Sequence, residues 1–269
     1  MAVASAASTS VIAHANGRYA AHDQTSRSLT VGAGVIVKPK YEGSNEHDVI
    51  AIPIIIPKLS DGTPSLMSEA RSRISVKGID DIRFRLFQTG PFEFGVVGGY
   101  RSDRDEDDAK RLVGLGDVDG GLLLGGYGGI RLGSVLFDAS GATPVTGDGT
   151  GIQIRFGAET ERQISQSFKL KARVGATYAS DVYMDHYFSV TTAQANRSVA
   201  GLGVFDAQAG IKDVHVELGA TFDIGERWLL KLDGRYARLV GDAADSPVIE
   251  TEDQFTGMVG FGYKFYIDH

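Results

Sequence analysis

The sequence DVHVELGATFDIGERWLLKLDGRY, residues 213–236, and the sequence FTGMVGFGYKF, residues 255–265, together repeat one pattern three times. In each copy apolar side chains recur at every second position, interrupted only by Gly234 and Gly257, and charged, hydroxylic or glycine residues predominate between them. Successive side chains of a β-strand point to opposite faces, so each copy is predicted to be a strand with one apolar and one polar face. Residues 225–227 separate the first two copies and are predicted to form a turn.

The length of these copies indicates their surroundings. Each runs about 11 to 13 residues, close to the roughly 9 to 11 that a tilted strand needs to cross a bilayer and above the usual 5 or 6. The polar faces are charged and carry glycine, as expected for the interior of a barrel. The apolar faces are therefore predicted to contact lipid and the polar faces to line the lumen of an outer-membrane β-barrel.

Composition agrees with this prediction and excludes several classes of protein. The chain has 269 residues, 42% of them hydrophobic, and lacks an apolar run near the roughly 18 residues of a membrane helix. It has no cysteine, which excludes disulfides and cysteine-based zinc sites, and no cofactor or metal site is expected. A net charge of −7 argues against nucleic acid as a partner.

The same alternation recurs along the chain and predicts an all-β fold, a transmembrane antiparallel up-and-down barrel of about twelve strands. Long connections follow the first, fifth, seventh, ninth and eleventh strands and short ones follow the others, as in even-stranded bacterial barrels. The connection over residues 58–69 follows the second predicted strand and is longer than this pattern predicts. The predicted strands span residues 29–37, 50–56, 72–77, 82–86, 92–101, 120–133, 134–142, 152–159, 168–178, 214–224, 228–236 and 255–265.

Residues 1–28 precede the predicted barrel of residues 29–269. Ala13, His14 and Ala15 have the small-x-small form of a signal-peptidase site, but no basic region precedes them. This stretch is interpreted as either a clipped signal remnant or a flexible periplasmic lead.

Ionisable side chains at alternate positions are predicted to face the lumen. Either the basic ones form a wall that favours small anions, or the acidic ones pair with them and plug the interior. His215 and Glu217 are expected to join Lys169, Arg173, Lys231 and Arg235 in a network rather than to act as an acid and a base. The fourteen lumen candidates are Arg83, Arg85, Glu93, Arg101, Arg155, Glu159, Lys169, Lys171, Arg173, His215, Glu217, Lys231, Asp233 and Arg235.

The most acidic stretch, residues 102–119, is predicted to be a solvated outer loop. Asp103, Asp105 and Asp107 have calcium-loop spacing, but the glycine and the closing glutamate of such a loop are missing. The alternative is a divalent cation bridging this loop to lipopolysaccharide phosphate.

An outer-membrane lipid hydrolase is the rival enzyme class, and its candidate residues crowd into one long loop. There is no G-x-S-x-G motif, and closeness along the chain does not establish a hydrogen bond between a serine and a histidine. No catalytic residue is therefore predicted. The candidates that were weighed are Ser180, Asp181, Asp185, His186 and Ser189.

Four loop sequences resemble the MipA/OmpV family: GVIVKPKYEGS at 34–44, RDEDD at 104–108 with GLGDVD at 114–119, DVYMDHYF at 181–188, and RLVGDAADSP at 238–247. The chain departs from the family pattern at Ser102-Asp103 and by continuing past Phe265. The family-motif loop residues are Pro39, Tyr41, Gly43, Ser44, Asp242, Asp245, Ser246 and Pro247.

This resemblance implies an outer-membrane barrel of a Gram-negative bacterium. Some members of the family are scaffolds that bridge a lytic transglycosylase and a peptidoglycan synthase, and others are surface antigens or adhesins. The sequence therefore predicts a scaffold or anchor in contact with outer-membrane lipid and lipopolysaccharide. The alternatives are a small-solute pore with a basic lumen and a surface adhesin or antigen.

Overall fold

The computed structural model describes residues 27–58, 73–78, 80–148 and 151–267. These residues form twelve β-strands, which matches the predicted number. The strands are β1 (Arg27–Pro39), β2 (His47–Lys58), β3 (Ile74–Gly78), β4 (Asp81–Thr89), β5 (Phe92–Arg101), β6 (Gly121–Leu132), β7 (Val135–Pro144), β8 (Gln153–Ser165), β9 (Phe168–Ala179), β10 (Gly210–Ile224), β11 (Trp228–Leu239) and β12 (Asp253–Ile267).

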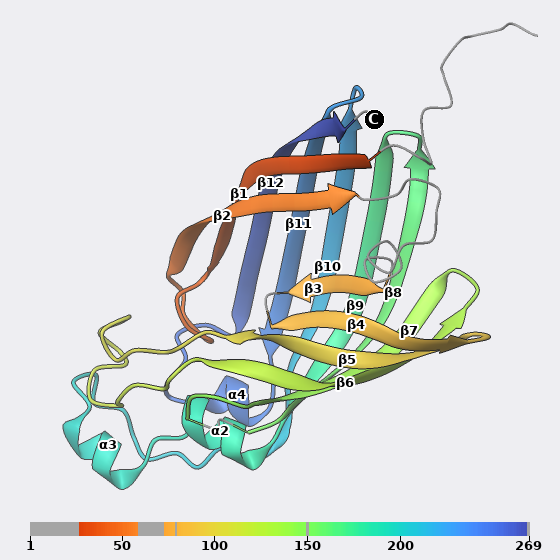
Figure 1. Cartoon of the computed structure of the whole chain (residues 1–269). Coiled ribbons are helices and arrows are strands. Elements are labelled where there is room, and N and C mark those ends of the chain that lie inside the picture. Colours follow the sequence, from red (N-terminus) through yellow and green to blue (C-terminus); the bar gives the residue numbers. More distant parts are fainter. Residues whose placement is uncertain (1–26, 59–72, 79, 149–150, 268–269) are drawn as a thin grey trace, which may run out of the picture.

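All twelve strands belong to one sheet, and every ladder in it is antiparallel. Apart from β2 and β3, strands that are neighbours in sequence are neighbours in the sheet. β1 also pairs with β12, so the order runs β2-β1-β12 and then back through β11 to β3. The sheet curls so that β3 and β4 cross in front of β8 and β9 (Figure 1). Within the described residues, β2 and β3 are the two ends of this order.

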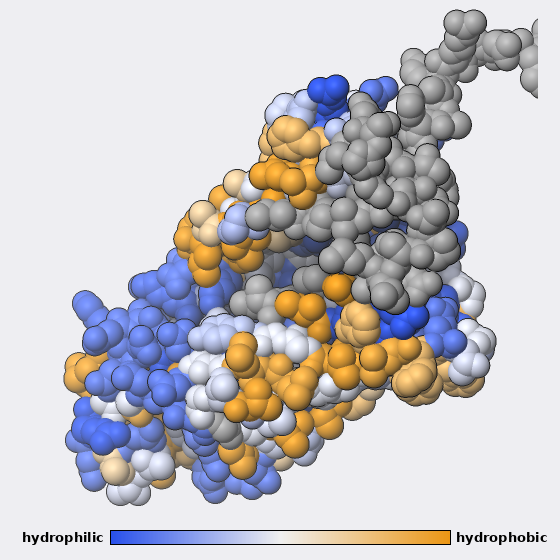
Figure 2. Space-filling model, in the orientation of Figure 1, coloured by the Kyte–Doolittle hydropathy of each residue, from blue (hydrophilic) through white to orange (hydrophobic). Residues whose placement is uncertain are grey.

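Most strands carry the predicted side chains on the two faces of the sheet. On β2 the prediction that the apolar face contacts lipid is wrong, because the register places Ile52 and Ile54 opposite Gly34 and Gly32 on the inner face. Leu218, Val259 and Phe94 are 62%, 53% and 47% exposed on the outer face, whereas Arg83 and Asp213 are 1% exposed on the inner face. A soluble protein buries its apolar face, so this inversion indicates that the outer face meets lipid. Figure 2 shows hydrophobic residues along β4, β5 and β6 and hydrophilic ones at the end that carries the loops.

The connections divide between two rims as predicted. Residues 40–46, 102–120, 145–148, 151–152, 180–209 and 240–252 lie at one rim, and the turns 90–91, 133–134, 166–167 and 225–227 lie at the other. Gly90 and Gly133 have φ of 55° and 60°, a left-handed conformation that tight hairpin turns require and that favours glycine.

Several predicted boundaries differ from the structure. The polar turn predicted over residues 161–167 is wrong, because β8 continues to Ser165; Glu161 pairs with Lys169 across the hairpin, with 3.1 Å between Oε1 and Nζ. β1 begins at Arg27 rather than Leu29, and β2 contains Lys58. The remainder of the predicted lead and of the 58–69 connection lies outside the described residues.

Glycines let the sheet bend sharply where β1 meets β12. Gly32 pairs with Gly262 and Gly34 with Gly260, all on the inner face. A Cβ on Gly260 would lie 2.7 Å from Cδ1 of Ile54 on β2, so the absent side chain makes room for that isoleucine. The wall formed by β1, β2 and β12 is consequently more apolar inside than the charged wall formed by β8 to β11.

Three short helices in the loops were not predicted from the sequence: α2 (Asp181–Tyr187), α3 (Thr192–Arg197) and α4 (Asp242–Asp245). Across the described part of the chain, none of the helices combines the length and the apolar character that crossing a membrane requires. The buried hydrophobic clusters lie among these loops at one end of the strands, not between two sheets.

Candidate functional site

The fourteen lumen candidates all occupy inward positions of the sheet, as the register shows. One row across the wall reads Glu159 on β8, Arg173 on β9, Glu217 on β10 and Arg235 on β11, each directly opposite the next. Opposite charges therefore alternate around the interior, an arrangement in which cross-strand neighbours attract each other.

A buried cluster joins β4, β7 and β9 through the carboxylate of Asp138. Oδ1 of Asp138 accepts a hydrogen bond from Nη1 of Arg83 at 2.8 Å, and Oδ2 accepts one from Nη1 of Arg173 at 2.6 Å. Arg83 also donates from Nε to Oδ1 of Asp81 at 2.7 Å and from Nη2 to Oγ of Ser140 at 3.1 Å. Two guanidinium groups and two carboxylates thus satisfy each other away from water, which a buried charge requires.

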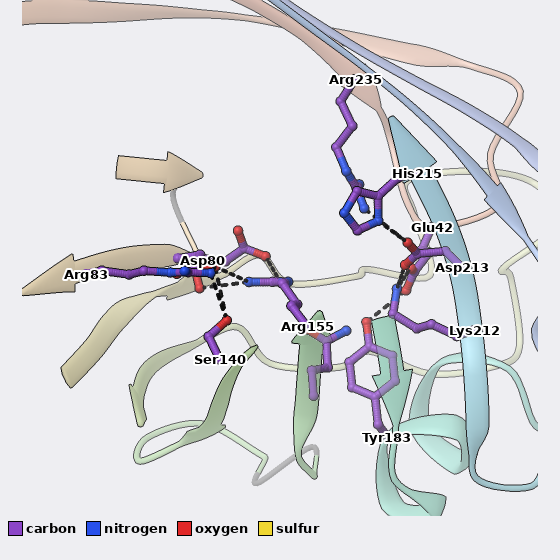
Figure 3. A network of polar contacts seen from close by, with 12 residues as sticks. Glu42, Asp80, Arg83, Ser140, Arg155, Tyr183, Lys212, Asp213, His215 and Arg235 are labelled. Carbon is purple, nitrogen blue, oxygen red and sulfur yellow. Dashed lines mark hydrogen bonds and ion pairs between the residues drawn. The ribbon is translucent and has the colours of Figure 1, made fainter. Parts of the chain in front are cut away.

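Two further ion pairs reach from the β3–β4 hairpin to β8. Lys77 of β3 pairs with Glu159, and Arg155 pairs with Asp80, which lies between β3 and β4. β3 and β8 are five places apart in the sheet order, so these side chains cross the interior. Figure 3 shows Arg83, Asp80, Ser140 and Arg155 gathered in this group.

A second cluster lies on β10 and β11, around Asp213. Its carboxylate accepts from Nδ1 of His215 at 2.8 Å and from Nη2 of Arg235 at 3.2 Å, and Oδ2 lies 3.1 Å from Nζ of Lys212. The register between β9 and β10 shifts between Ile211 and Asp213. This bulge allows the consecutive residues Lys212 and Asp213 both to be buried, at 5% and 1% exposure.

The second cluster connects the barrel wall to the long loops, which bacterial barrels carry at their extracellular rim. Lys212 pairs with Glu42 of the β1–β2 connection, and Oη of Tyr183 on α2 donates to Oε2 of Glu42 at 2.8 Å (Figure 3). The guanidinium of Arg101, at the end of β5, lies 4.9 Å from the centre of the Tyr183 ring. Burial and the charge of Glu42 raise the pKa of the Tyr183 phenol well above its ordinary value.

The loops of the extracellular rim pack against each other, and we call their described residues, 40–46, 102–120, 180–209 and 240–252, the cap. One buried cluster is built around Phe188 and Met184, and the other around Leu112, Val190 and Val248. Figure 1 places α2 and α4 at the ends of the strands. The cap thus has a hydrophobic core of its own, assembled from four connections.

Several family-motif loop residues hold the cap together. Ser246 donates from Oγ to the carbonyl of Phe188 at 2.5 Å, and Nη2 of Arg111 donates to the carbonyl of Pro247 at 2.7 Å. Tyr41 is buried, and its pKa is raised by that burial and by Glu250. Gly43 accepts at its carbonyl from the backbone of residues 250 and 251.

The remaining motif residues make local contacts. Oδ2 of Asp242 accepts from the backbone N–H of Gln208 at 2.8 Å, and the N–H of Asp245 donates to the carbonyl of Gly241 at 3.1 Å. Oγ of Ser44 accepts from the N–H of Glu46 at 3.0 Å, and Pro39 ends β1 opposite His47. The motif residues therefore stabilise loop conformations and bring no titratable groups together in a catalytic arrangement.

The prediction of a solvated outer loop over residues 102–119 is wrong for its apolar residues. Leu112, Leu115 and Val118 are buried in the cap, as is Arg104, which is 4% exposed. Burial lowers the pKa of Arg104. Within the described ranges no three side chains of metal-ligating type are grouped as a cation site, and Glu106 instead accepts from the N–H groups of Gly114 and Gly116.

The residues that were weighed as the site of a hydrolase make contacts within the loops instead. Nδ1 of His186 lies 2.7 Å from the carbonyl oxygen of Val182, and Oγ of Ser189 donates to Oδ1 of Asp185 at 3.2 Å. Oγ of Ser180 accepts from the N–H of Ile152, and Oδ1 of Asp181 accepts from the N–H of Ala209. These contacts organise the long loop.

A sequence model of the family described as "MltA-interacting protein MipA" matches residues 31–265. The chain belongs to the MipA family. Among proteins similar to this MipA-family chain is one of Escherichia coli (strain K12) named "Putative outer membrane protein YiaT", 25% identical over 247 residues that cover 90% of this chain and 92% of that protein. A protein of the same name in Escherichia coli O157:H7 has the same identity and coverage.

Solved outer-membrane proteins also align with the MipA-family structure, although only loosely. Salmonella typhi OmpF in complex with daunomycin has a TM-score of 0.39 at 8% identity, covering 89% of this chain and 97% of that one. Vibrio cholerae OmpT has a TM-score of 0.37 at 6% identity, with the same coverage. The fold rests on the strand pairing above; together with the family and the named relatives it identifies an outer-membrane β-barrel protein.

Several residues of the MipA-family interior were not singled out from the sequence. Asp138 and Ser140 alternate with Phe137 and Ala139 along β7, a signal that could have revealed them. The bulge disguises Lys212 because it interrupts the alternation. Thr191 and Gln194 form the capping box that begins α3, another readable signal, whereas nothing local marks Glu42 or Asp80 as partners of distant cations.

Proposed function

We propose that this MipA-family protein anchors or scaffolds peptidoglycan-remodelling enzymes at the outer membrane. One observation carries the proposal: ionic contacts cross the interior, and a packed cap lies at the extracellular end. In an eight-stranded barrel the side chains just fill the lumen, and a twelve-stranded barrel has a wider one. A twelve-stranded barrel can therefore be an open pore only if its interior side chains stay near the wall. Here Arg83, Asp138 and Arg173 meet across it instead.

The energetics favour a static interior over a conducting one. Asp138 and Arg83 have side chains 0% and 1% exposed, and parting such a pair leaves a buried charge without compensation, which costs about 3 to 5 kcal/mol. The cap adds two buried apolar clusters that must separate before it can open. A rigid interior of this kind is compatible with a scaffold protein, which binds its partners on its outer surfaces.

The family description supports the class of partner. It names an interaction with MltA, and the resemblance implies a lytic transglycosylase and a peptidoglycan synthase in the periplasm. The rim with the short turns faces that side in this topology. Partners are therefore expected to meet the short-turn rim, the lead before β1 and the connection between β2 and β3.

Capture of purified lytic transglycosylase and peptidoglycan synthase by the immobilised protein tests the proposal. One variant lacks residues 2–26, which spares β1, and another has residues 59–69 shortened. Capture is expected to weaken in at least one of them while the barrel stays heat-modifiable on gels. A matched control replaces Val199 and Val204, which are 73% and 62% exposed in the cap, with serine and is expected to retain capture.

A pore predicts different results. In planar bilayers Arg155→Glu or Arg173→Glu then reverses ion preference, while neither periplasmic change affects capture. That combination overturns the scaffold proposal, as does capture lost only in the control variant.

A further inference from the structure

The β3–β4 hairpin is attached to the barrel by two kinds of contact. The first is backbone pairing: β4 pairs with β5 along most of its length, whereas β3 has five residues and, among the described residues, pairs with β4 alone. The register between β3 and β4 also shifts between Val76 and Gly78. A short and irregular ladder therefore holds the end of the hairpin near Lys77 and Asp80, which we call the tip residues.

The second kind of contact is ionic and joins both tip residues to β8, across the interior. Lys77 pairs with Glu159, and Asp80 pairs with Arg155 (Figure 3). Nη1 of Arg155 also donates to the carbonyl oxygen of Asp80 at 3.2 Å. Arg155 and Glu159 are separated by an even number of positions, so they lie on the same face of β8. The hairpin therefore contacts β8 at two points, through charged groups.

The base of the hairpin is held by much more deeply buried groups. The side chains of Arg83 and Asp138 are 1% and 0% exposed, whereas those of the tip pairs range from 11% for Lys77 to 40% for Asp80. Water screens a partly exposed ion pair, which consequently contributes little, but parting a buried pair leaves a charge without compensation. The contacts of the tip should therefore part well before those of the base.

Parting the tip contacts does not leave the charges of β8 isolated. Oδ2 of Asp81 lies 3.9 Å from Nη1 of Arg155, and Nη1 of Arg173 lies 3.9 Å from Oε2 of Glu159. Each member of the two pairs that belongs to β8 thus keeps an opposite charge nearby when its partner on the tip leaves. The hairpin has a second arrangement available in which the interior charges are still compensated.

We propose that the tip residues form an ionic strap, a releasable contact between the β3–β4 hairpin and β8, for which Arg83 and Asp138 are the fixed base. When both ion pairs part, the end of the hairpin moves away from β8, and Arg155 and Glu159 become exposed to water. The cap still lies over the extracellular end, so release of the strap alone does not open a pore. The strap does not depend on the proposed scaffold function, which is tested by capture of partners.

Pulsed electron paramagnetic resonance tests the strap through the distance between two spin labels, one on β3 and one on β8. The chain has no cysteine, so Ser75→Cys with Glu161→Cys directs the labels to these two exposed positions alone. In lipid nanodiscs the otherwise unchanged protein is expected to give one narrow distance distribution. Adding Lys77→Gln with Asp80→Asn is expected to make a longer and broader distribution the major one.

Two variants serve as controls. Lys264→Gln with Asp223→Asn removes an interior pair that lies outside the hairpin and whose side chains are 23% and 38% exposed, close to the 20% and 40% of Arg155 and Asp80. Lys77→Arg keeps the positive charge at the tip. Both are expected to retain the narrow distribution, because neither removes a charge from the strap.

High salt is a second measurement, should the double substitution at the tip fold poorly. Raising the salt concentration from about 0.1 M to 1 M shortens the Debye length from about 10 Å to 3 Å, which weakens the most exposed ion pairs first. The doubly labelled protein is expected to shift toward the longer distance. A distribution that stays narrow both in the tip variant and at high salt overturns the proposal, as does one that is already broad in the unchanged protein. An equal shift in the Lys264 and Asp223 variant also overturns it.

Discussion

Arg83 of β4 and Asp138 of β7 belong to strands three places apart in the sheet, yet Nη1 of Arg83 lies 2.8 Å from Oδ1 of Asp138. Because β4 and β7 do not pair with each other, this contact is not a cross-strand pair. The sheet curls, and the two side chains meet in its interior. Arg173 of β9 shares the same carboxylate. A single aspartate therefore ties together three strands through the interior.

Asp138→Asn is expected to destabilise the protein by about 3 to 5 kcal/mol, because it leaves two buried guanidinium groups without their carboxylate. The free energy of unfolding in lipid vesicles, measured with a chemical denaturant, checks this. Asp107→Asn, at an exposed site in the outer loop, is the control and should change stability little. Equal effects of the two substitutions would contradict a structural role for Asp138.

Leu218→Arg is expected to cost about 2 to 4 kcal/mol if it lies near the midplane, because Leu218 faces lipid, and Leu232→Arg should behave alike. The inward control is placed at Thr221. The register places Thr221 between Lys169 and Lys231, so Thr221→Glu is the better matched charge. Folding yield into liposomes measures all three, and equal yields would refute the assignment of faces.

Ser246→Ala is expected to loosen the cap, because the hydroxyl donates to the carbonyl of Phe188 and accepts from the N–H of Val248. Loss of buried partners of this kind costs about 1 to 3 kcal/mol. Amide hydrogen exchange should then rise in residues 181–209. Ser165→Ala, at the opposite rim, serves as the control, and unchanged exchange in Ser246→Ala would show that the contact is dispensable.

Alkaline pH is expected to destabilise the cap. Burial raises the pKa values of Tyr41 and Tyr183 above the ordinary value near 10, with added contributions from Glu250 and Glu42. A group whose folded pKa is raised contributes stability that is fully present below its unfolded pKa and is lost as pH rises toward the folded one. Stability should therefore decline above about pH 10.

Ultraviolet titration of tyrosinate measures this directly. In the folded protein some of the ten tyrosines should resist ionisation near pH 10, and in denaturant all should ionise there. Titration of all ten near pH 10 in the folded protein would contradict the buried state of Tyr41 and Tyr183.

Local pattern was enough to predict much of this protein. Alternation such as Val214, Val216 and Leu218 against His215 and Glu217 shows directly which residues share a face, because the period of a strand is two. Turn residues such as Gly133 and the contrast between long and short connections then fix the order of the strands. Twelve strands, the faces of all of them but β2, and the outer-membrane location therefore follow from residues near one another in the chain.

The interior contacts and the cap depend on distances along the chain that no local pattern records. Glu42 and Lys212 are partners only because the sheet curls and the β1–β2 connection folds over the wall. Leu112 is buried although its neighbours are among the most acidic in the sequence, because residues 180–209 and 240–252 cover it. Alternation sets the face on which a side chain lies, whereas the curvature of the sheet and the packing of its loops decide what that side chain touches.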